Sequence, residues 1–224
     1  MSNPVPTATT DAVEALWPEP LPRQDESVDS AFYSFARLVT HIDDGAIEAV
    51  TTLYREKVTA GARVLDLMSS WISHLPDDVA YAEVVGLGMN PEELAKNARL
   101  SRHVVQDLNQ DARLPFAAAY FDAALICVSV DYLVRPSEVF RELGRVVKQG
   151  GVLVVTFSNR CFPTKVAGPW LDLDDAGRLA FVASRIRAAG NWAEVVMLDR
   201  SPAYGDPLFA VIARRPVSLP IPPQ

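Results

Sequence analysis

Cysteine, histidine and long apolar runs are scarce in this 224-residue chain, and each shortage excludes a class of protein. The two cysteines, Cys127 and Cys161, cannot form a disulfide framework, and the three histidines do not combine with them into a metal-ligand pattern. No apolar run approaches the roughly 18–20 residues that a membrane-spanning helix needs. The first residues lack the basic and apolar regions of a signal peptide. We therefore expect a cytoplasmic chain with no membrane span and no metal site.

Positive charge is also in the minority. Lys and Arg number 21 against 28 Asp and Glu, which gives a net charge of −7, and no long basic run occurs. This balance disfavours broad binding to nucleic acid or to anionic membranes and leaves room only for a local basic patch. The hydrophobic content of 49% and charged content of 22% are ordinary for a globular protein. The sequence carries no signal for an oligomeric state.

Proline is concentrated near the two ends of the chain. Five prolines fall within residues 4–22 and four within residues 216–223. Because proline removes a backbone donor and disfavours helix, we predict an extended N-terminal arm over residues 1–24 and a tail over 216–224. Between them we expect a helical extension over residues 25–60 and an α/β domain over residues 61–215.

Apolar spacing predicts two helices in the extension. Phe32, Phe35 and Val39 recur at helical spacing, and the apolar residues from Ile47 to Val58 recur in the same way. Asp43 and Asp44 are expected to cap the second helix.

Buried-strand patterns alternate with helical ones after residue 61, which is typical of a parallel sheet with right-handed crossovers. The last two strands flank a turn-rich segment at 201–207 and predict an antiparallel hairpin. The fold class is therefore α/β: a Rossmann-like seven-stranded sheet, mostly parallel, with helices on both faces. The predicted strands cover residues 63–67, 83–89, 103–106, 121–129, 152–157, 194–198 and 208–213, and helices begin at Asn90, Pro136 and Asp174.

Glycine is missing where it would be most informative. Asp66 stands near the carboxyl end of the first strand, the edge at which ligands bind in open α/β sheets. Such a strand normally runs into a glycine-rich turn that lets the backbone approach a ligand. Here the turn reads Met-Ser-Ser-Trp at residues 68–71. The fold can therefore be predicted before the activity can.

Three spaced motifs carry a family resemblance. They are Leu-Pro-Phe at 114–116, Phe-Asp at 121–122 and Arg-Val-Val-Lys-Gln-Gly-Gly at 145–151, in which Gln149 replaces the usual proline. Residues 61–215 resemble the class I S-adenosylmethionine-dependent methyltransferases, in particular the small-molecule group that includes quinone-biosynthesis enzymes. The chain also looks like a branch of that superfamily whose first motif lacks glycine.

The resemblance implies S-adenosylmethionine as cofactor and assigns it a site. The first-motif acid corresponds to Asp66, and the glycine turn corresponds to Met68, Ser69 and Ser70, whose hydroxyls are expected to donate to the cofactor's carboxylate. The ribose-binding acid falls on Gly88, which leaves Asn90 to contact the ribose. These departures predict weak binding, which Gly at 69 together with Asp at 88 is expected to tighten.

The adenine side of the implied site follows the third strand. Asp107 or Asp111 corresponds to the acid that contacts the adenine amino group. We prefer Asp107, with Leu108 beside it, because it lies nearer the strand end. Either aspartate would also suit a simple Asx turn.

Candidates for acceptor chemistry lie at the same sheet edge. Asp131 and Tyr132 follow the fourth strand, and His41 is a third candidate base. Tyr33 is expected to close over the pocket, and Asn159 and Arg160 to follow the fifth strand at its rim.

Two functions follow. The first is in-line methyl transfer to a small-molecule partner, in which positioning supplies most of the catalysis. The alternative is a non-catalytic ligand-sensing or protein-interaction module, which the altered motifs favour. A nicotinamide-dependent dehydrogenase is disfavoured because its glycine fingerprint and ribose acid are missing.

Overall fold

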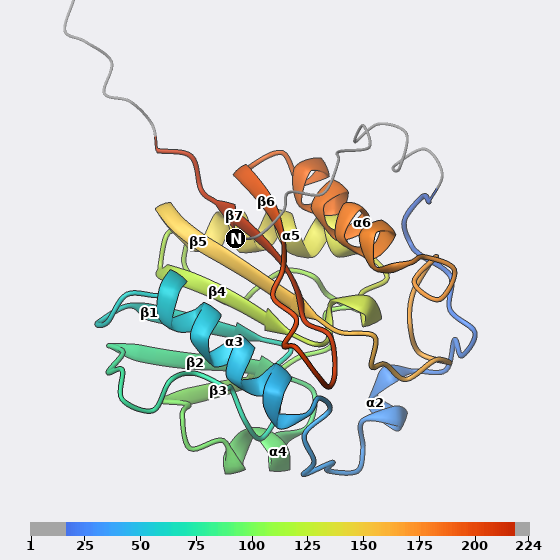
Figure 1. Cartoon of the computed structure of the whole chain (residues 1–224), viewed down its shortest axis with the longest axis horizontal. Coiled ribbons are helices and arrows are strands. Elements are labelled where there is room, and N and C mark those ends of the chain that lie inside the picture. Colours follow the sequence, from blue (N-terminus) through green and yellow to red (C-terminus); the bar gives the residue numbers. More distant parts are fainter. Residues whose placement is uncertain (1–16, 218–224) are drawn as a thin grey trace, which may run out of the picture.

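A central sheet of seven strands organises the molecule, in the order β3-β2-β1-β4-β5-β7-β6 (Figure 1). The computed structural model describes residues 17–217, so most of the two predicted arms lies outside the described residues. β1 to β5 are parallel, and β7 runs antiparallel to both β5 and β6, which confirms the predicted sheet and its hairpin. The strands are β1 (Arg63–Leu67), β2 (Glu83–Gly88), β3 (Arg102–Val105), β4 (Phe121–Cys127), β5 (Val147–Phe157), β6 (Ala193–Asp199) and β7 (Phe209–Arg214).

Helices cover both faces of this sheet, as predicted. One face packs against α3, and the other against α5 and α6 (Figure 1). Asp43, Asn90 and Asp174 cap α3, α4 and α6 by accepting backbone N–H groups of their first turns. None of the helices within residues 17–217 is long and apolar enough to cross a membrane. The helices are α2 (Asp29–Phe32), α3 (Asp44–Lys57), α4 (Pro91–Lys96), α5 (Pro136–Val146) and α6 (Asp175–Ala188).

The fifth strand begins earlier than its apolar run predicts. β5 starts at Val147, directly after α5, because Val147 pairs with Phe121 before the register shifts and pairing resumes between Val152 and Ala123. Gly150 lies in this irregular stretch with a φ of 76°, where a side chain would be strained. The Gly-Gly pair therefore permits a bend inside the strand and does not end the helix.

The helix predicted across Phe32, Phe35 and Val39 is wrong. Only residues Asp29–Phe32 are helical, and the chain from 33 to 43 is irregular. Backbone groups of this segment bond to distant side chains, through Asn90 to the Tyr33 carbonyl and Trp71 to the Val39 carbonyl. These contacts replace the internal hydrogen bonds that a helix would make.

The connection from β1 to β2 also departs from strict alternation. Residues 68–82 contain no helix, so the turn after β1 does not open onto a helix N-terminus. The usual anion site of such folds, where helix N–H groups face a ligand, is therefore missing at this position.

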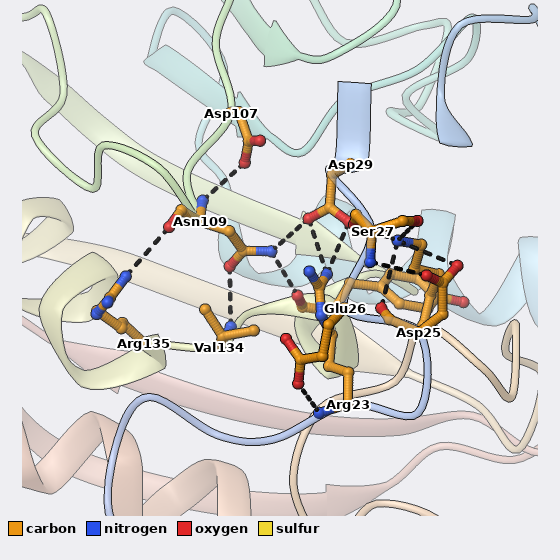
Figure 2. Close-up of polar contacts among 11 residues, drawn as sticks. Arg23, Asp25, Glu26, Ser27, Asp29, Asp107, Asn109, Val134 and Arg135 are labelled. Atoms are coloured by element: carbon orange, nitrogen blue, oxygen red, sulfur yellow. Dashed lines mark hydrogen bonds and ion pairs between the residues drawn. The ribbon is translucent and has the colours of Figure 1, made fainter. Parts of the chain in front are cut away.

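Residues 23–29 are fixed to the domain by a buried ionic cluster. Arg23 lies 2.7 Å and Lys165 3.2 Å from the Asp29 carboxylate, and the Asn109 amide donates to it at 2.8 Å. Figure 2 shows Arg23 from the N-terminal segment and Asn109 from the loop after β3 converging on Asp29. Lys165 is 1% exposed and Asp29 4%, so each charge depends on the other for its stability.

Removing one member of this cluster tests its importance. Asp29→Asn should lower the free energy of unfolding by roughly 3–5 kcal/mol, because it leaves buried cations without their partner. Burial opposes ionisation of Asp29, but hydrogen bonds from Asn109 and Arg23 outweigh it and hold its pKa below the usual value. The wild type should therefore lose this contribution as the pH falls through that depressed pKa, and the variant should not.

Asp25→Asn is the matched control, because Asp25 lies 3.3 Å from Lys165 but its side chain is 34% exposed. Denaturant unfolding of both variants should give a much smaller loss for Asp25. Equal losses would contradict the assignment of Asp29 as the centre of the cluster.

Candidate functional site

A cavity of about 390 Å³ opens at the carboxyl edge of the sheet. The ends of β1, β2 and β4, the loop after β3 and the segment 33–41 form its walls. Such a volume is typical of small-molecule sites. Eleven residues singled out in the sequence line it: Tyr33, His41, Met68, Ser69, Ser70, Gly88, Asn90, Asp107, Leu108, Tyr132 and Arg160.

Asp66 lies behind this cavity, not in its wall. Its Oδ2 accepts hydrogen bonds from the Ser69 and Ser73 hydroxyls, both at 2.6 Å. The side chain is 4% exposed, and burial raises its pKa to about 6 against the opposing effect of the two serines. Asp66 therefore holds the turn that follows β1.

Two non-glycine residues at the cavity adopt left-handed backbone conformations. Met68 has a φ of 57° and Val128 a φ of 48°, each directly after its strand, β1 and β4. This conformation is a true outlier for a β-branched residue such as Val128. Strain of this kind, on the order of 1–3 kcal/mol per residue, is concentrated at functional sites.

The hydroxyl protons of Ser69 and Ser70 are both used in hydrogen bonds to carboxylates of the protein. Ser69 Oγ donates to Asp66, and Ser70 Oγ donates to Glu93 Oε2 at 2.6 Å. Since each hydroxyl has one proton, this arrangement leaves neither serine a side-chain donor for a cofactor carboxylate, contrary to expectation. Both residues still line the cavity and can accept.

Gly88 is required by packing. A Cβ at this position would lie 2.1 Å from the Ser69 carbonyl oxygen, a backbone atom that cannot swing aside. The expectation that Asp at 88 would improve binding is therefore wrong, because the turn after β1 occupies the space of its side chain.

Asn90 is committed to structure. Its Oδ1 accepts the N–H groups of Glu92 and Glu93, and its Nδ2 donates to the Tyr33 carbonyl at 2.9 Å. It caps α4 and fixes the segment 33–41. The expected ribose contact would have to use its remaining amide proton.

Glu93 was not singled out from the sequence. It is 8% exposed, lines the cavity, and accepts from the Arg37 backbone N–H at 2.6 Å as well as from Ser70. In the sequence it is an ordinary acidic residue in the first turn of a helix that begins at Asn90. Only the three-dimensional position of Ser70 and Arg37 distinguishes it.

Asp107 and Asp111 occupy different positions relative to the cavity. Asp107 lines the cavity, and its Oδ1 accepts the Asn109 N–H at 2.9 Å in an Asx turn (Figure 2). No hydrogen bond to its Oδ2 occurs within residues 17–217. Asp111 is exposed, makes its own Asx turn to Arg113 and is not part of the wall. The geometry therefore favours Asp107 as the ligand-facing acid.

The three candidate bases for the methyl acceptor differ in whether they line the cavity. Tyr132 and His41 line the cavity, whereas Asp131 does not. Burial lowers the pKa of His41, so its imidazole is neutral at pH 7 and can accept a proton. Burial also raises the pKa of Tyr132, whose hydroxyl oxygen accepts the Phe162 N–H at 2.8 Å.

The Arg37 side chain lies beside these candidates and is flanked by two phenylalanine rings. The Arg37 guanidinium lies 4.5 Å from the Phe32 ring centroid and 5.5 Å from that of Phe162. His41 packs edge-on against Phe162. Arg160 also lines the cavity, and its Nε lies 3.0 Å from Asp206. Asn159 is exposed and forms no part of the wall.

A comparison with known protein families finds a match over part of this chain. The model of a methyltransferase domain family matches residues 68–155, from the turn after β1 into β5. The fold is that of the class I methyltransferases. Among curated proteins, no relative matches the chain. No group of three or more His, Cys, Asp or Glu side chains that could hold a metal ion occurs in the described part of the chain.

Solved structures share this class I methyltransferase fold at low identity. The [4+2]-cyclase SpnF is 18% identical with a TM-score of 0.60, and the alignment covers 96% of this chain and 100% of SpnF. An S-adenosylmethionine-dependent methyltransferase from Mesorhizobium loti is 17% identical with a TM-score of 0.53, over 77% of this chain and 99% of that one. A putative methyltransferase from Haloferax volcanii, solved with the Trm112 activator, is 18% identical with a TM-score of 0.58, over 79% and 92%.

The close approach at Gly88 gives a direct test of the turn. Gly88→Ala should destabilise the protein by about 1–3 kcal/mol, because the added methyl group forces the Ser69 backbone to move. Gly45→Ala is the control, since its Cβ would meet its nearest neighbours at 3.5 Å, an ordinary contact. Thermal unfolding measures both variants. A Gly88→Ala protein as stable as the control would show that the turn is loose.

Asp131 should make stability depend on pH. Its Oδ2 is buried and has no hydrogen-bond partner among residues 17–217, and burial raises its pKa to about 7. The folded state therefore holds a proton that the unfolded state releases, so stability should fall as the pH rises from about 4 to 7. Asp131→Asn should remove up to about 4 kcal/mol of that fall. Chemical denaturation of both proteins at pH 4 and pH 8 measures the difference, and equal losses in the two proteins would refute the assignment.

Proposed function

We propose that this protein is an S-adenosylmethionine-dependent methyltransferase that acts on a small molecule. The observation that carries the proposal is the cavity at the carboxyl edge, where the residues implied by the family resemblance meet. The family match over residues 68–155 supports the same reading. In open α/β sheets this edge is where ligands bind.

The wall of the cavity suits an adenosyl group. Gly88 presents bare backbone, Met68 and Leu108 offer apolar surface, and Asp107 has an oxygen without a protein partner among the described residues. The Ser129 hydroxyl is a buried polar atom on the same wall that also lacks a partner within residues 17–217. Unpaired buried groups of this kind favour a ligand that completes their hydrogen bonds.

The chain's own residues would contribute mainly by positioning. When bound, S-adenosylmethionine supplies an electrophilic methyl group. The segment 33–41 walls the cavity and limits the entry of water. Arg37 and the Phe162 ring, which lie together in the wall, orient an acceptor. Where the acceptor must lose a proton, the neutral imidazole of His41 is the base that faces the cavity.

A second candidate is a ligand-binding module without methyl transfer. Two observations favour it: the turn after β1 carries side chains in place of glycines, and no helix follows it. The similar fold of SpnF, a [4+2]-cyclase, illustrates that this architecture can host other reactions.

Titration calorimetry separates these functions when it is combined with a transfer assay. S-adenosylmethionine and S-adenosylhomocysteine are titrated into the pure protein, which is then incubated with the methyl donor and a metabolite extract. Binding with release of S-adenosylhomocysteine supports the enzyme. Binding without release supports the module, and no binding of either molecule refutes the cofactor.

Asp107 provides the variant for the same titration. Asp107→Ala should weaken S-adenosylhomocysteine binding by about 1–3 kcal/mol, because it removes an acceptor for the adenine amino group. Asp111→Ala removes a comparable Asx turn outside the cavity and should leave the affinity unchanged. Equal affinities for the two variants would exclude Asp107 from the site.

A further inference from the structure

Three carboxylates line the cavity, and their charges are balanced differently. Asp29 is neutralised by Arg23 and Lys165. Asp107 lies at the opening of the loop after β3 and is half-buried. Glu93 is 8% exposed, and within residues 17–217 no cation forms an ion pair with it. It is therefore the carboxylate whose burial is least compensated by the protein itself.

The hydrogen bonds of Glu93 fix its position but do not fill its capacity. Oε1 accepts the Arg37 N–H and Oε2 accepts the Ser70 hydroxyl, both at 2.6 Å. An ionised carboxylate offers about four acceptor sites, so about one remains on each oxygen. Burying such a group is costly unless further donors reach it. A ligand with two adjacent hydroxyl groups would supply one donor to each oxygen.

The place of Glu93 in the fold agrees with this chemistry. It lies in the first turn of α4, five positions beyond the last residue of β2, at the same edge as Gly88. An acid cannot project from Gly88 itself, because the Ser69 carbonyl fills the space of its Cβ. The carboxylate on this side of the cavity therefore comes from the neighbouring helix α4, in which Glu93 lies.

We propose that Glu93 binds the vicinal ribose hydroxyls of an adenosyl ligand in this cavity. The proposal rests on the proposed function, since it takes the adenosyl group as the ligand. Glu93 is preorganised for this task by Ser70 on one side and by the Arg37 backbone on the other. Hydrogen bonds from the segment 33–41 and from the turn after β1 thus fix the orientation of the Glu93 carboxylate.

A comparison of two nucleosides isolates the hydroxyl contacts. Adenosine and 2′,3′-dideoxyadenosine are titrated into the full chain by calorimetry, and the ratio of their affinities is measured. The wild type should prefer adenosine by about tenfold or more, since hydrogen bonds to a charged group are lost with the dideoxy compound. Glu93→Gln should reduce this preference severalfold, with most of the loss in adenosine binding.

Glu92→Gln is the matched control. Glu92 is the preceding residue on the same helix, is exposed, and pairs with Lys96 outside the cavity. It changes the charge identically and should retain the wild-type ratio. Glu93→Asp keeps the charge but withdraws the carboxylate by one methylene, and it should also reduce the ratio if the contact is direct.

The outcomes distinguish this proposal from the function on which it rests. If S-adenosylhomocysteine binds but the adenosine preference survives in Glu93→Gln, Glu93 is not the ribose ligand, although the cofactor site stands. If only S-adenosylhomocysteine binding falls in Glu93→Gln, with the nucleoside ratio kept, the carboxylate contacts the amino-acid portion and the proposal is overturned. If no adenosyl compound binds the wild type, the proposed function fails first.

Discussion

The architecture of the site depends on the buried carboxylate of Asp66. Two serine hydroxyls, one in the turn after β1 and one four residues later, donate to the same oxygen. No helix follows that turn before β2, so its path across the end of β2 is fixed by these two bonds together with the Ser69 N–H bond to the Leu87 carbonyl and the Asn97 amide bond to the Ser70 carbonyl. That path places a carbonyl oxygen where a side chain at Gly88 would lie. The missing glycines and the missing ribose acid are thus two results of one local arrangement.

The same arrangement connects the N-terminal segment to the sheet. Trp71, Asn90 and Glu93 all bond to backbone groups between residues 33 and 39. These three side chains come from the regions in which the family resemblance predicts contacts to the cofactor. In this chain they bind backbone groups of the N-terminal segment, and they make residues 33–41 a wall of the cavity. Departures from the family pattern therefore correspond to contacts that the structure supplies.

Local signals explain which parts were predictable. The strands and the caps at Asp43, Asn90 and Asp174 are encoded within a few residues. The seven-stranded sheet, its mostly parallel pairing and its hairpin therefore follow from the sequence. Strand ends also predict most of the cavity wall, because parallel strands end at one edge. The boundaries of β5 were missed because its first residues carry the Gly-Gly irregularity.

Long-range hydrogen bonds explain what was missed. The apolar spacing at Phe32, Phe35 and Val39 is compatible with a helix, but the bonds that decide its conformation come from residues more than 30 positions away. The committed protons of Ser69 and Ser70 and the role of Glu93 depend on the same distant geometry. Asp66 and Asp131 were placed at the correct edge, yet neither belongs to the wall of this cavity.

The ionic cluster around Asp29 also determines when the cavity can exist. Asn109 and Lys165 reach residues 25–29 across separations of 80 to 140 positions. Closing such long loops carries an entropic cost before any contact forms. On the ribosome, residues 23–41 emerge before the strands of the sheet, and they gain their contacts to Lys165 only after it has been synthesised. The N-terminal part of the cavity wall is therefore made before the strands whose edge it covers, and it is among the last parts of the domain to acquire its structure.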